Sequence, residues 1–401
     1  MTTETQTASR RRASFHTLTV SEVRRLTDDA IEVTFGVPAE LPGQFDYLPG
    51  QYVALRTTLP DADGQPHEIR RSYSICAEPR SFADGSSEIR VAIKKDLGGL
   101  FSTWANAELR AGDVLDVMSP MGAFVSKHGR DGKSVEQNVM NSMNHPEELA
   151  GEPGSFVAIA AGSGITPVIA IARTLLAAHP ETRFDLVYAN KAAMDVMFLE
   201  ELADLKDRYP ARLALHHVLS REQRIAPLLS GRIDAEKLQA LLGTAIHAED
   251  VDEWFLCGPF ELVQLCRDTL AARGVAPEHV RFELFTSGKP ERPEGNIGRP
   301  VVTDESKETY KITFKLDGLQ GEVASPTHAR ESILNAALRV RPDVPFACAG
   351  GVCGTCRAKV VSGNVTMDEN YALEQDELDK GYVLTCQSHP TTPEVTVDFD
   401  V

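Results

Sequence analysis

The chain has 401 residues, of which 42% are hydrophobic and 25% are charged, and its formal net charge is −17. This length predicts roughly two to four domains, each with its own core. The negative charge argues against nucleic acid as a partner, because phosphate binding needs a basic face. The sequence has no membrane-length apolar run and no hydrophobic leader, so we expect a cytoplasmic protein that does not contact a membrane.

The N-terminal part of the chain has the pattern of a small antiparallel barrel. We predict that residues 1–14 form a frayed tail. In residues 15–126, short apolar or β-branched runs alternate with turns rich in Gly, Pro and Asp. Many short strands with regular turn signals are typical of such a barrel. The predicted strands include residues 18–23, 31–37, 52–56, 89–94 and 114–118.

One predicted strand of this barrel carries Arg71, Tyr73 and Ser74. They offer a cation, an aromatic ring and a hydroxyl, which suit the phosphate, the ring and the N5 edge of a flavin. The alternative is a solvated arginine beside an ordinary half-buried strand aromatic. A later turn rich in glycine offers backbone donors to phosphate, and its candidate residues are Lys94, Gly99 and Ser102.

Residues 127–154 form a long connection between the barrel and the segment that follows. Connections of this length are usually either disordered or functional. We predict a loop here and assign it no role.

From residue 155 to residue 286 short apolar runs alternate with helical patterns, which predicts a parallel sheet covered by helices. The predicted strands are residues 156–160, 184–189, 213–219 and 254–257, and the helices between them include 168–178, 198–209 and 260–273.

The first strand of this segment ends in a turn that contains Gly162 and Gly164. Two glycines permit a tight turn and let a pyrophosphate approach the positive end of the following helix. We predict that Thr166 caps that helix and that Pro167 occupies its first position. Because the third glycine of a full dinucleotide fingerprint is missing, a plain strand-to-helix turn is the alternative.

After a predicted linker at residues 287–308, residues 309–401 form the last predicted domain. It holds four cysteines in the plant-type spacing for a 2Fe–2S cluster, C-x4-C-x2-C followed by a distant fourth. Glycines in this loop let N–H groups point at the sulfurs. A zinc site would pair two short C-x2-C units, and a disulfide framework suits short secreted chains. The predicted metal ligands are Cys348, Cys353, Cys356 and Cys386.

Together these motifs resemble the ferredoxin-NADP reductase superfamily, in the subgroup whose order is flavin barrel, nicotinamide domain and C-terminal plant-type ferredoxin. The resemblance covers nearly all of residues 15–401. Within the subgroup the chain is similar to the reductase subunits of ring-1,2-phenylacetyl-CoA epoxidases, which are multicomponent diiron monooxygenases. Residues 127–154 depart from those subunits, in which we expect a shorter connection. The resemblance rests on residues 70–76, 161–167, 231–234, 257–259, 370–374, 381–387 and 397–400.

The resemblance implies a multi-domain fold, with an antiparallel β-barrel for the flavin, an α/β parallel-sheet domain for the nucleotide and an α+β β-grasp ferredoxin domain. It implies FAD, a 2Fe–2S cluster and NADPH, with NADH as the alternative nucleotide. It also implies that an oxygenase component, the diiron monooxygenase subunits of phenylacetate catabolism, receives the electrons.

The same resemblance implies which residues meet the reacting groups. Tyr73 and Ser74 would lie at the flavin ring, Thr166 near the point of hydride transfer and Cys257 beside the nicotinamide. A buried small hydrophobe is the alternative for Cys257, and we assign that role to the other cysteines outside the cluster motif, Cys76 and Cys266. The implied FAD ligands are Arg71, Tyr73, Ser74, Lys94, Gly99 and Ser102.

A Ser–Arg pair after the third strand of the nucleotide domain is similar to the 2′-phosphate site of these reductases. The planar fork of arginine suits a phosphate and favours NADPH, whereas the alternative is a solvated loop arginine. The resemblance also places Glu283 and Phe285 close to the flavin. The implied nucleotide ligands are Gly162, Gly164, Thr166, Ser220, Arg221, Gly258 and Pro259.

Electron counting gives the expected function. NADPH gives two electrons as hydride, FAD can hold one or two, and the cluster passes them singly to the partner's metal centre. Protein groups would mainly position the rings, without a general base or covalent nucleophile. One alternative is a reductase for a Rieske-type aromatic-ring or steroid hydroxylase, which has the same domain order. Another is a non-catalytic redox sensor that keeps both flavin and cluster.

Overall fold

The computed structural model describes residues 15–41, 43–60, 66–96, 99–122, 124–128, 153–246, 250–284, 308–316, 318–341, 344, 346, 351, 354–370, 373 and 375–400. The predicted tail, residues 129–152 of the predicted loop and residues 287–307 of the predicted linker lie outside this part. By its internal contacts the chain forms two compact units, residues 17–291 and residues 1–16 with 292–401.

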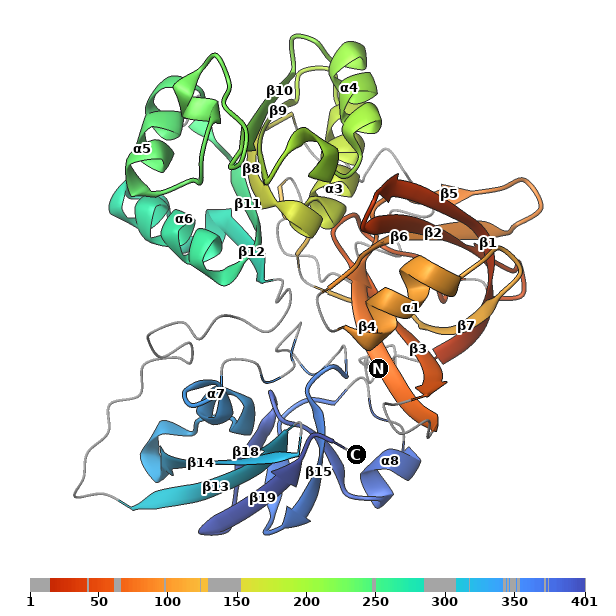
Figure 1. Ribbon diagram of the computed structural model, residues 1–401, viewed down its shortest axis with the longest axis vertical. Coiled ribbons are helices and arrows are strands. Elements are labelled where there is room, and N and C mark those ends of the chain that lie inside the picture. The colour runs from red at the N-terminus through yellow and green to blue at the C-terminus, as the bar shows by residue number, and fades with distance from the viewer. Residues whose placement is uncertain are drawn as a thin grey trace, which may run out of the picture. The chain divides into compact units, whose positions relative to one another are not determined.

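The larger unit begins with a curled antiparallel sheet (Figure 1). Its strands lie in the order β4-β3-β7-β1-β2-β6-β5, and a bridge between Ile75 and Val91 joins the end of the fourth strand to the sixth. Apolar side chains of these strands form one interior core, which Phe101 of a short helix completes. The predicted barrel is therefore confirmed. The elements are β1 (Phe15–Thr27), β2 (Ala30–Val37), β3 (Tyr52–Pro60), β4 (Pro66–Ser74), β5 (Arg80–Ser81), β6 (Ser87–Lys94), α1 (Leu100–Glu108) and β7 (Val114–Met118).

A parallel sheet follows in the same unit, with strand order β10-β9-β8-β11-β12. Each described neighbour pair is parallel, as the alternation of strands and helices predicted. The order reverses between β8 and β11, and ligands of such sheets bind outside the carboxyl ends of the strands at that point. The elements are β8 (Ser155–Ala161), α3 (Ile165–Ala178), β9 (Arg183–Asn190), α4 (Leu199–Arg208), β10 (Leu213–Leu219), α5 (Ala235–Thr244), β11 (Glu253–Gly258), α6 (Phe260–Ala272) and β12 (Val280–Leu284).

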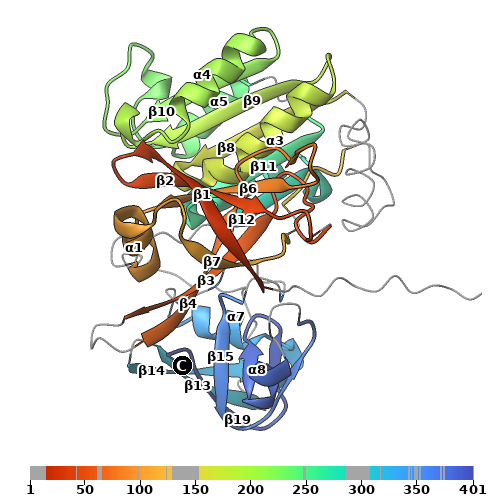
Figure 2. The ribbon, with the colours of Figure 1, turned by 90° about the vertical axis from the view of Figure 1, so that its right-hand side faces the viewer.

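Side chains of the parallel strands alternate between two cores. Phe156 and Ala158 of β8 pack with α3 and α4, whereas Val157 and Ile159 pack with α5 and α6. Helices therefore cover both faces of the sheet, as Figures 1 and 2 show. The near-continuous apolar runs of these strands follow from this double burial.

The barrel and the parallel sheet share part of their hydrophobic core. Ala30 and Ala92 of the barrel strands, together with Cys76 in the segment after β4, pack in the same cluster as Ile171 of α3. Phe124, which follows β7, belongs to this cluster, and its ring meets Phe255 of β11 edge-on at a centroid distance of 5.8 Å. This shared core joins the two sheets within the larger unit.

A buried carboxylate also ties the end of the barrel to the parallel sheet. Glu253, at the start of β11, is 3% exposed. It accepts hydrogen bonds from Ser126 Oγ at 2.5 Å and from the Lys127 amide at 2.8 Å, and it pairs with Arg281 of β12 at 3.0 Å. With two donors and an opposite charge, this acid is fully compensated in its buried position.

The smaller unit is built on a mixed sheet with strand order β14-β13-β19-β15-β17, and it also contains a two-stranded sheet of β16 and β18. Its core joins Phe314 and Val397 of the sheet to Leu334 of the covering helix. The predicted α+β domain is confirmed. The elements are β13 (Thr309–Leu316), β14 (Leu319–Pro326), α7 (Ile333–Leu338), β15 (Arg357–Ser362), β16 (Val365–Met367), α8 (Gln375–Asp379), β17 (Tyr382–Leu384), β18 (Ser388–Pro390) and β19 (Glu394–Asp398).

Among the residues that the structure describes, no helix is long and apolar enough to cross a membrane.

The contact between barrel and sheet depends on a glycine. Gly50 has φ +98°, and a Cβ atom there would overlap the carbonyl oxygen of Phe124 and lie 3.0 Å from Ile171 Cδ1. We expect Gly50→Ala to lower the thermal unfolding midpoint of the holoprotein. The left-handed backbone alone costs an alanine about 1–2 kcal/mol, and overpacking adds about 1–3 kcal/mol.

Gly112→Ala is the matched control, because Gly112 has φ +97° and nothing within 4 Å of its added Cβ. Circular dichroism melting of both variants separates backbone strain from the clash. Equal losses in the two variants would contradict a packing role for Gly50.

Candidate functional site

The end of β4 presents the three residues that the sequence singled out. Arg71 is exposed, and its Nη1 donates to the Arg70 carbonyl at 2.7 Å. Tyr73 is half-buried, with its ring centroid 5.7 Å from that of Phe101 on α1. Burial raises the pKa of the Tyr73 hydroxyl, and the nearby Arg71 opposes that rise. Ser74 is buried at the strand end. An aromatic ring and a cation thus share one face of this strand.

The first turn of α1 lies next to these residues. Its N-cap is Gly99, with no side-chain cap and no acidic residue in the first turn, so its N–H groups favour an anion. Ser102 Oγ accepts from the Asp96 amide at 3.0 Å. Lys94 pairs with Asp29 at 3.1 Å, so its charge is already partly compensated. Gly98, in the same predicted turn, lies outside the described residues.

The turn after β8 is a 3-10 turn, Gly162–Gly164, that leads directly into α3. Gly162 has φ +53°, a conformation that glycine adopts without strain. A Cβ atom on Gly164 would overlap the carbonyl oxygen of Cys257 and lie 2.6 Å from its carbonyl carbon. The absence of a side chain therefore lets the positive end of α3 approach the end of β11.

The predicted cap of this helix is wrong. The N-cap is Gly164, α3 begins at Ile165, and Pro167 is its third residue. Thr166 is 2% exposed, and its hydroxyl donates back to the Ser163 carbonyl at 2.9 Å. The two glycines allow the turn to tighten, so the helix starts earlier than the hydroxyl and proline signals indicated. Proline is tolerated there because the first helical N–H groups have no intrahelical partner.

Ser74, Cys257 and Glu283 meet where the barrel touches the parallel sheet. Ser74 Oγ donates to Glu283 Oε2 at 3.3 Å, although the two residues are 209 positions apart. Glu283 on β12 is the register partner of Cys257 on β11. Cys257 is 0% exposed, and burial followed by the Glu283 charge raises the pKa of its thiol well above the usual value. Phe285, predicted beside Glu283, lies outside the described residues.

The residues after Cys257 complete this edge. A Cβ atom on Gly258 would lie 3.1 Å from Ala161 Cβ, so the ends of β8 and β11 pack closely. Pro259 is exposed and is the N-cap of α6. Cys76 and Cys266 are 0% and 1% exposed, in agreement with their prediction as buried small side chains.

The Ser–Arg pair lies at the carboxyl end of β10. The Ser220 amide donates to the Asn190 carbonyl at 2.9 Å, and the Arg221 amide donates to the Lys191 carbonyl at 2.7 Å. These bonds join the loops after β9 and β10. The Arg221 side chain is exposed, as are those of Lys191 and Arg224. We call Lys191, Arg221 and Arg224 the basic edge of this domain, in a chain whose net charge is negative.

Two of the four motif cysteines lie in the described part of the smaller unit. Cys356 is 2% and Cys386 is 8% exposed. The Thr385 amide and hydroxyl both donate to the Cys356 carbonyl, at 3.1 and 2.9 Å, which holds the two cysteine segments together. Gly354, between the motif positions, has φ +72°. Cys348 and Cys353 lie outside the described residues.

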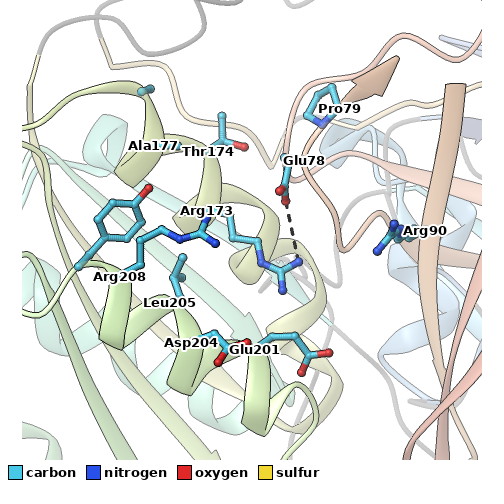
Figure 3. Close-up of a pocket in the computed structure, with 12 residues that line it drawn as sticks. Glu78, Pro79, Arg90, Arg173, Thr174, Ala177, Glu201, Asp204, Leu205 and Arg208 are labelled. Atoms are coloured by element: carbon cyan, nitrogen blue, oxygen red, sulfur yellow. Dashed lines mark ion pairs between the residues drawn. The ribbon is translucent and has the colours of Figure 1, made fainter. Parts of the chain in front are cut away.

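Apart from these groups, the larger unit has a cavity of about 470 Å³ between the barrel and helices α3 and α4 (Figure 3). Arg173 of α3 projects into it and pairs with Glu78 of the barrel at 3.9 Å. The lining carries both signs of charge and consists of Glu78, Pro79, Arg90, Arg173, Thr174, Ala177, Ala178, Glu201, Asp204, Leu205, Arg208 and Tyr209.

Three sequence families match successive parts of the chain. The oxidoreductase FAD-binding domain matches residues 17–125, and the oxidoreductase NAD-binding domain matches residues 158–268. The 2Fe-2S iron-sulfur cluster binding domain matches residues 316–391.

Two characterised relatives cover almost the whole chain. A component of the 1,2-phenylacetyl-CoA epoxidase of Escherichia coli (strain K12) is 41% identical over 387 residues, which is 96% of this chain and 98% of that protein. The 3-ketosteroid-9-alpha-monooxygenase ferredoxin reductase component of Rhodococcus rhodochrous is 30% identical over 384 residues, which is 95% and 96% of the two chains.

Two solved structures share the fold. Phthalate dioxygenase reductase, described as a modular structure for electron transfer from pyridine nucleotides to [2Fe-2S], has a TM-score of 0.50 and 20% identity, with 96% and 98% of the two chains covered. The FAD/NAD-binding domain of a Vibrio cholerae nitric oxide dioxygenase has a TM-score of 0.53 and 23% identity, with 68% of this chain and 98% of that chain covered.

The contact between Cys257 and Glu283 predicts a specific change in thiol reactivity. Because the Glu283 charge helps to raise the pKa of the Cys257 thiol, we expect Glu283→Gln to lower that pKa. The pH at which iodoacetamide begins to alkylate Cys257 should then be lower in the variant than in the unaltered protein. Peptide mass spectrometry across a pH series measures this alkylation.

Cys266 is the internal control, because burial alone raises the pKa of its thiol to about 12. Glu283→Gln should leave the reactivity of Cys266 unchanged. Parallel acceleration at both cysteines would indicate a loosened fold instead of a local charge effect.

Proposed function

We propose that this chain, which belongs to the family of reductase components that includes the Escherichia coli 1,2-phenylacetyl-CoA epoxidase component, carries electrons from NADPH to a diiron oxygenase. The observation that carries the proposal is 41% identity over 96% of this chain and 98% of the relative. The chain is a flavin- and iron–sulfur-containing NAD(P)H oxidoreductase, because it contains all three matching domains in this order.

The barrel residues fit FAD. Arg71 offers an exposed cation, Tyr73 a half-buried ring, and α1 an N-terminus without acidic residues, which together suit a phosphate-bearing aromatic cofactor. We infer that Arg71, Gly99 and Ser102 hold its phosphates, while Tyr73 and Ser74 hold its ring. Lys94, which pairs with Asp29, would act through the local positive field.

The smaller unit fits a 2Fe–2S cluster. Cys356 and Cys386 are buried thiols whose segments are joined by Thr385, and Gly354 supplies the backbone freedom that a cluster loop needs. We infer that Cys348 and Cys353 complete the ligand set.

FAD held by these barrel residues would supply the conversion of a two-electron hydride donor into single electrons for the cluster. The chain's own groups position the reacting rings. We propose that Ser74 and Glu283 fix the edge of the site by their mutual hydrogen bond, and that Cys257 stays a neutral thiol against the nicotinamide. Gly162, Gly164 and Thr166 shape the turn for the nucleotide, and Gly258 and Pro259 border it.

NADPH is proposed over NADH because of the basic edge beside Ser220. We expect Arg221→Ala to lower kcat/KM for NADPH about tenfold or more, since a charge-assisted hydrogen bond to phosphate is lost. The kcat/KM for NADH should hardly change. Steady-state ferricyanide reduction with each nucleotide measures the effect.

Arg208→Ala provides a matched exposed arginine on α4, away from the loops after β9 and β10. It should leave both nucleotides unaffected. An equal loss with NADPH and NADH in Arg221→Ala would refute a role in 2′-phosphate recognition.

The proposed partner is a set of diiron monooxygenase subunits that act on phenylacetyl-CoA, and the proposed location is the cytoplasm, where NADPH and reduced thiols are maintained. We expect the purified holoprotein, mixed with the oxygenase subunits of a phenylacetyl-CoA epoxidase, to oxidise NADPH in a manner that depends on phenylacetyl-CoA. Mass spectrometry of the epoxide product then measures whether NADPH oxidation is coupled to epoxide formation.

Cys386→Ser serves as the control, because loss of a cluster ligand should abolish coupling while NADPH-driven ferricyanide reduction at the flavin persists. Coupling to a 3-ketosteroid 9α-oxygenase, and none to the epoxidase, would replace the proposed partner by the steroid enzyme that the Rhodococcus relative serves. Failure to reduce cytochrome c with NADPH would favour the redox-sensor alternative.

A further inference from the structure

Tyr188 lies near the carboxyl end of β9 and reaches the turn after β8. Its side chain is 0% exposed, and its hydroxyl donates to the Gly162 carbonyl at 2.9 Å. Its ring packs in the core on the α3 and α4 face of the sheet, with the His217 ring centroid 5.9 Å away. A phenylalanine would fill this space equally well, so core packing alone does not explain the hydroxyl.

The hydroxyl acts on a turn whose carbonyl groups point back into the protein. The Gly162 carbonyl accepts from Tyr188 and also from the Ile165 amide. The next carbonyl, of Ser163, accepts from the Thr166 hydroxyl and from the same amide. Each carbonyl oxygen therefore accepts one hydroxyl, and the single Ile165 N–H is shared between the two oxygens. Two buried hydroxyls hold two successive peptide groups in one orientation.

This orientation determines where the amide groups point. In a trans peptide the C=O and N–H groups point in opposite directions. Because the Gly162 carbonyl is drawn toward Tyr188, the Ser163 N–H is directed away from the core. On that turn a Cβ atom at Gly162 would meet nothing within 4 Å, so there is open space beside it. The positive end of α3 follows immediately and favours negative charge.

The hydroxyl is a dependable donor. Burial raises the pKa of Tyr188, so the group remains protonated across the working pH range. Hydrogen bonds with the Asn190 side chain and the Met197 backbone oppose this rise, so the same hydroxyl also contacts the loop after β9.

We propose that Tyr188 is a positioning residue, whose buried hydroxyl orients the Gly162–Ser163 peptide so that its N–H binds the diphosphate of the nicotinamide nucleotide. The inference rests on the proposed function and adds a residue that the motifs of the turn do not contain. Tyr188 does not touch the nucleotide but acts through the backbone that does.

Tyr188→Phe tests this role in the holoprotein. We expect the Kd for NADP⁺ and the KM for NADPH to rise about fivefold, the usual worth of one hydrogen bond. The kcat for ferricyanide reduction at saturating NADPH should stay within about twofold, because uniform binding is lost and the reacting rings are not moved. Flavin content and the unfolding midpoint report whether the fold is intact.

Two further variants keep the test decisive. Tyr209→Phe is the matched control, because Tyr209 lies in the same domain and its ring packs under the Arg212 guanidinium at 4.4 Å. This variant should change neither the Kd for NADP⁺ nor the KM for NADPH. Thr166→Val removes the second hydroxyl and should raise the same KM, whereas Thr166→Ser should restore it. The Thr166 variants test the turn as a whole, because Thr166 also borders the nucleotide, whereas the role of Tyr188 itself is decided by Tyr188→Phe, whose ring fills the same space.

Unchanged nucleotide affinity in Tyr188→Phe, or a fall in kcat and flavin content without a change in KM, would overturn the positioning role. If the unaltered holoprotein binds neither NADP⁺ nor NAD⁺, the proposed function fails before this inference is tested.

Discussion

A side chain at residue 164 would collide with the carbonyl oxygen of Cys257, and much of the site depends on the space that its absence leaves. The close approach brings the positive end of α3 against the end of β11. Cys257 is held there in register with Glu283, and Glu283 in turn meets Ser74 of the barrel. One glycine thus links the nucleotide turn to the contact between the two sheets.

Local charge and overall charge have different effects in this protein. A net charge of −17 favours solubility and repels nucleic acid, but it does not prevent a basic edge at Lys191, Arg221 and Arg224. In the interior, too, charge is balanced locally by pairing and does not follow the net charge of the chain. Buried acids such as Glu253 and Glu331 persist because each is paired, Glu253 with Arg281 and Glu331 with Arg339, and because hydroxyls complete their hydrogen bonds.

The fold was largely predictable because its signals are local. Short apolar runs bounded by turns identified the strands of both sheets, and the spacing from Cys348 to Cys386 identified the cluster domain. Tertiary contacts were not predictable in the same way. The Ser74–Glu283 hydrogen bond spans 209 positions, and no local pattern connects its partners.

Local signals also failed where a stronger constraint competed with them. Thr166 and Pro167 are favourable residues at a helix start, but the two glycines tightened the turn and moved the start to Ile165. The Tyr188 hydroxyl carried no motif at all, because its partner is a backbone carbonyl.

The charged cavity between the barrel and helices α3 and α4 has a mechanical consequence. The apolar cluster around Phe124 and Ile171 loses buried area with any separation, so it resists opening. The ion pair between Arg173 and Glu78 spans a gap large enough for water, and such pairs contribute only about 0–1 kcal/mol. They can exchange partners after a small displacement with little change in free energy. A small lateral displacement would therefore cost the charged side of this contact little free energy, whereas separation would expose the apolar cluster beside it.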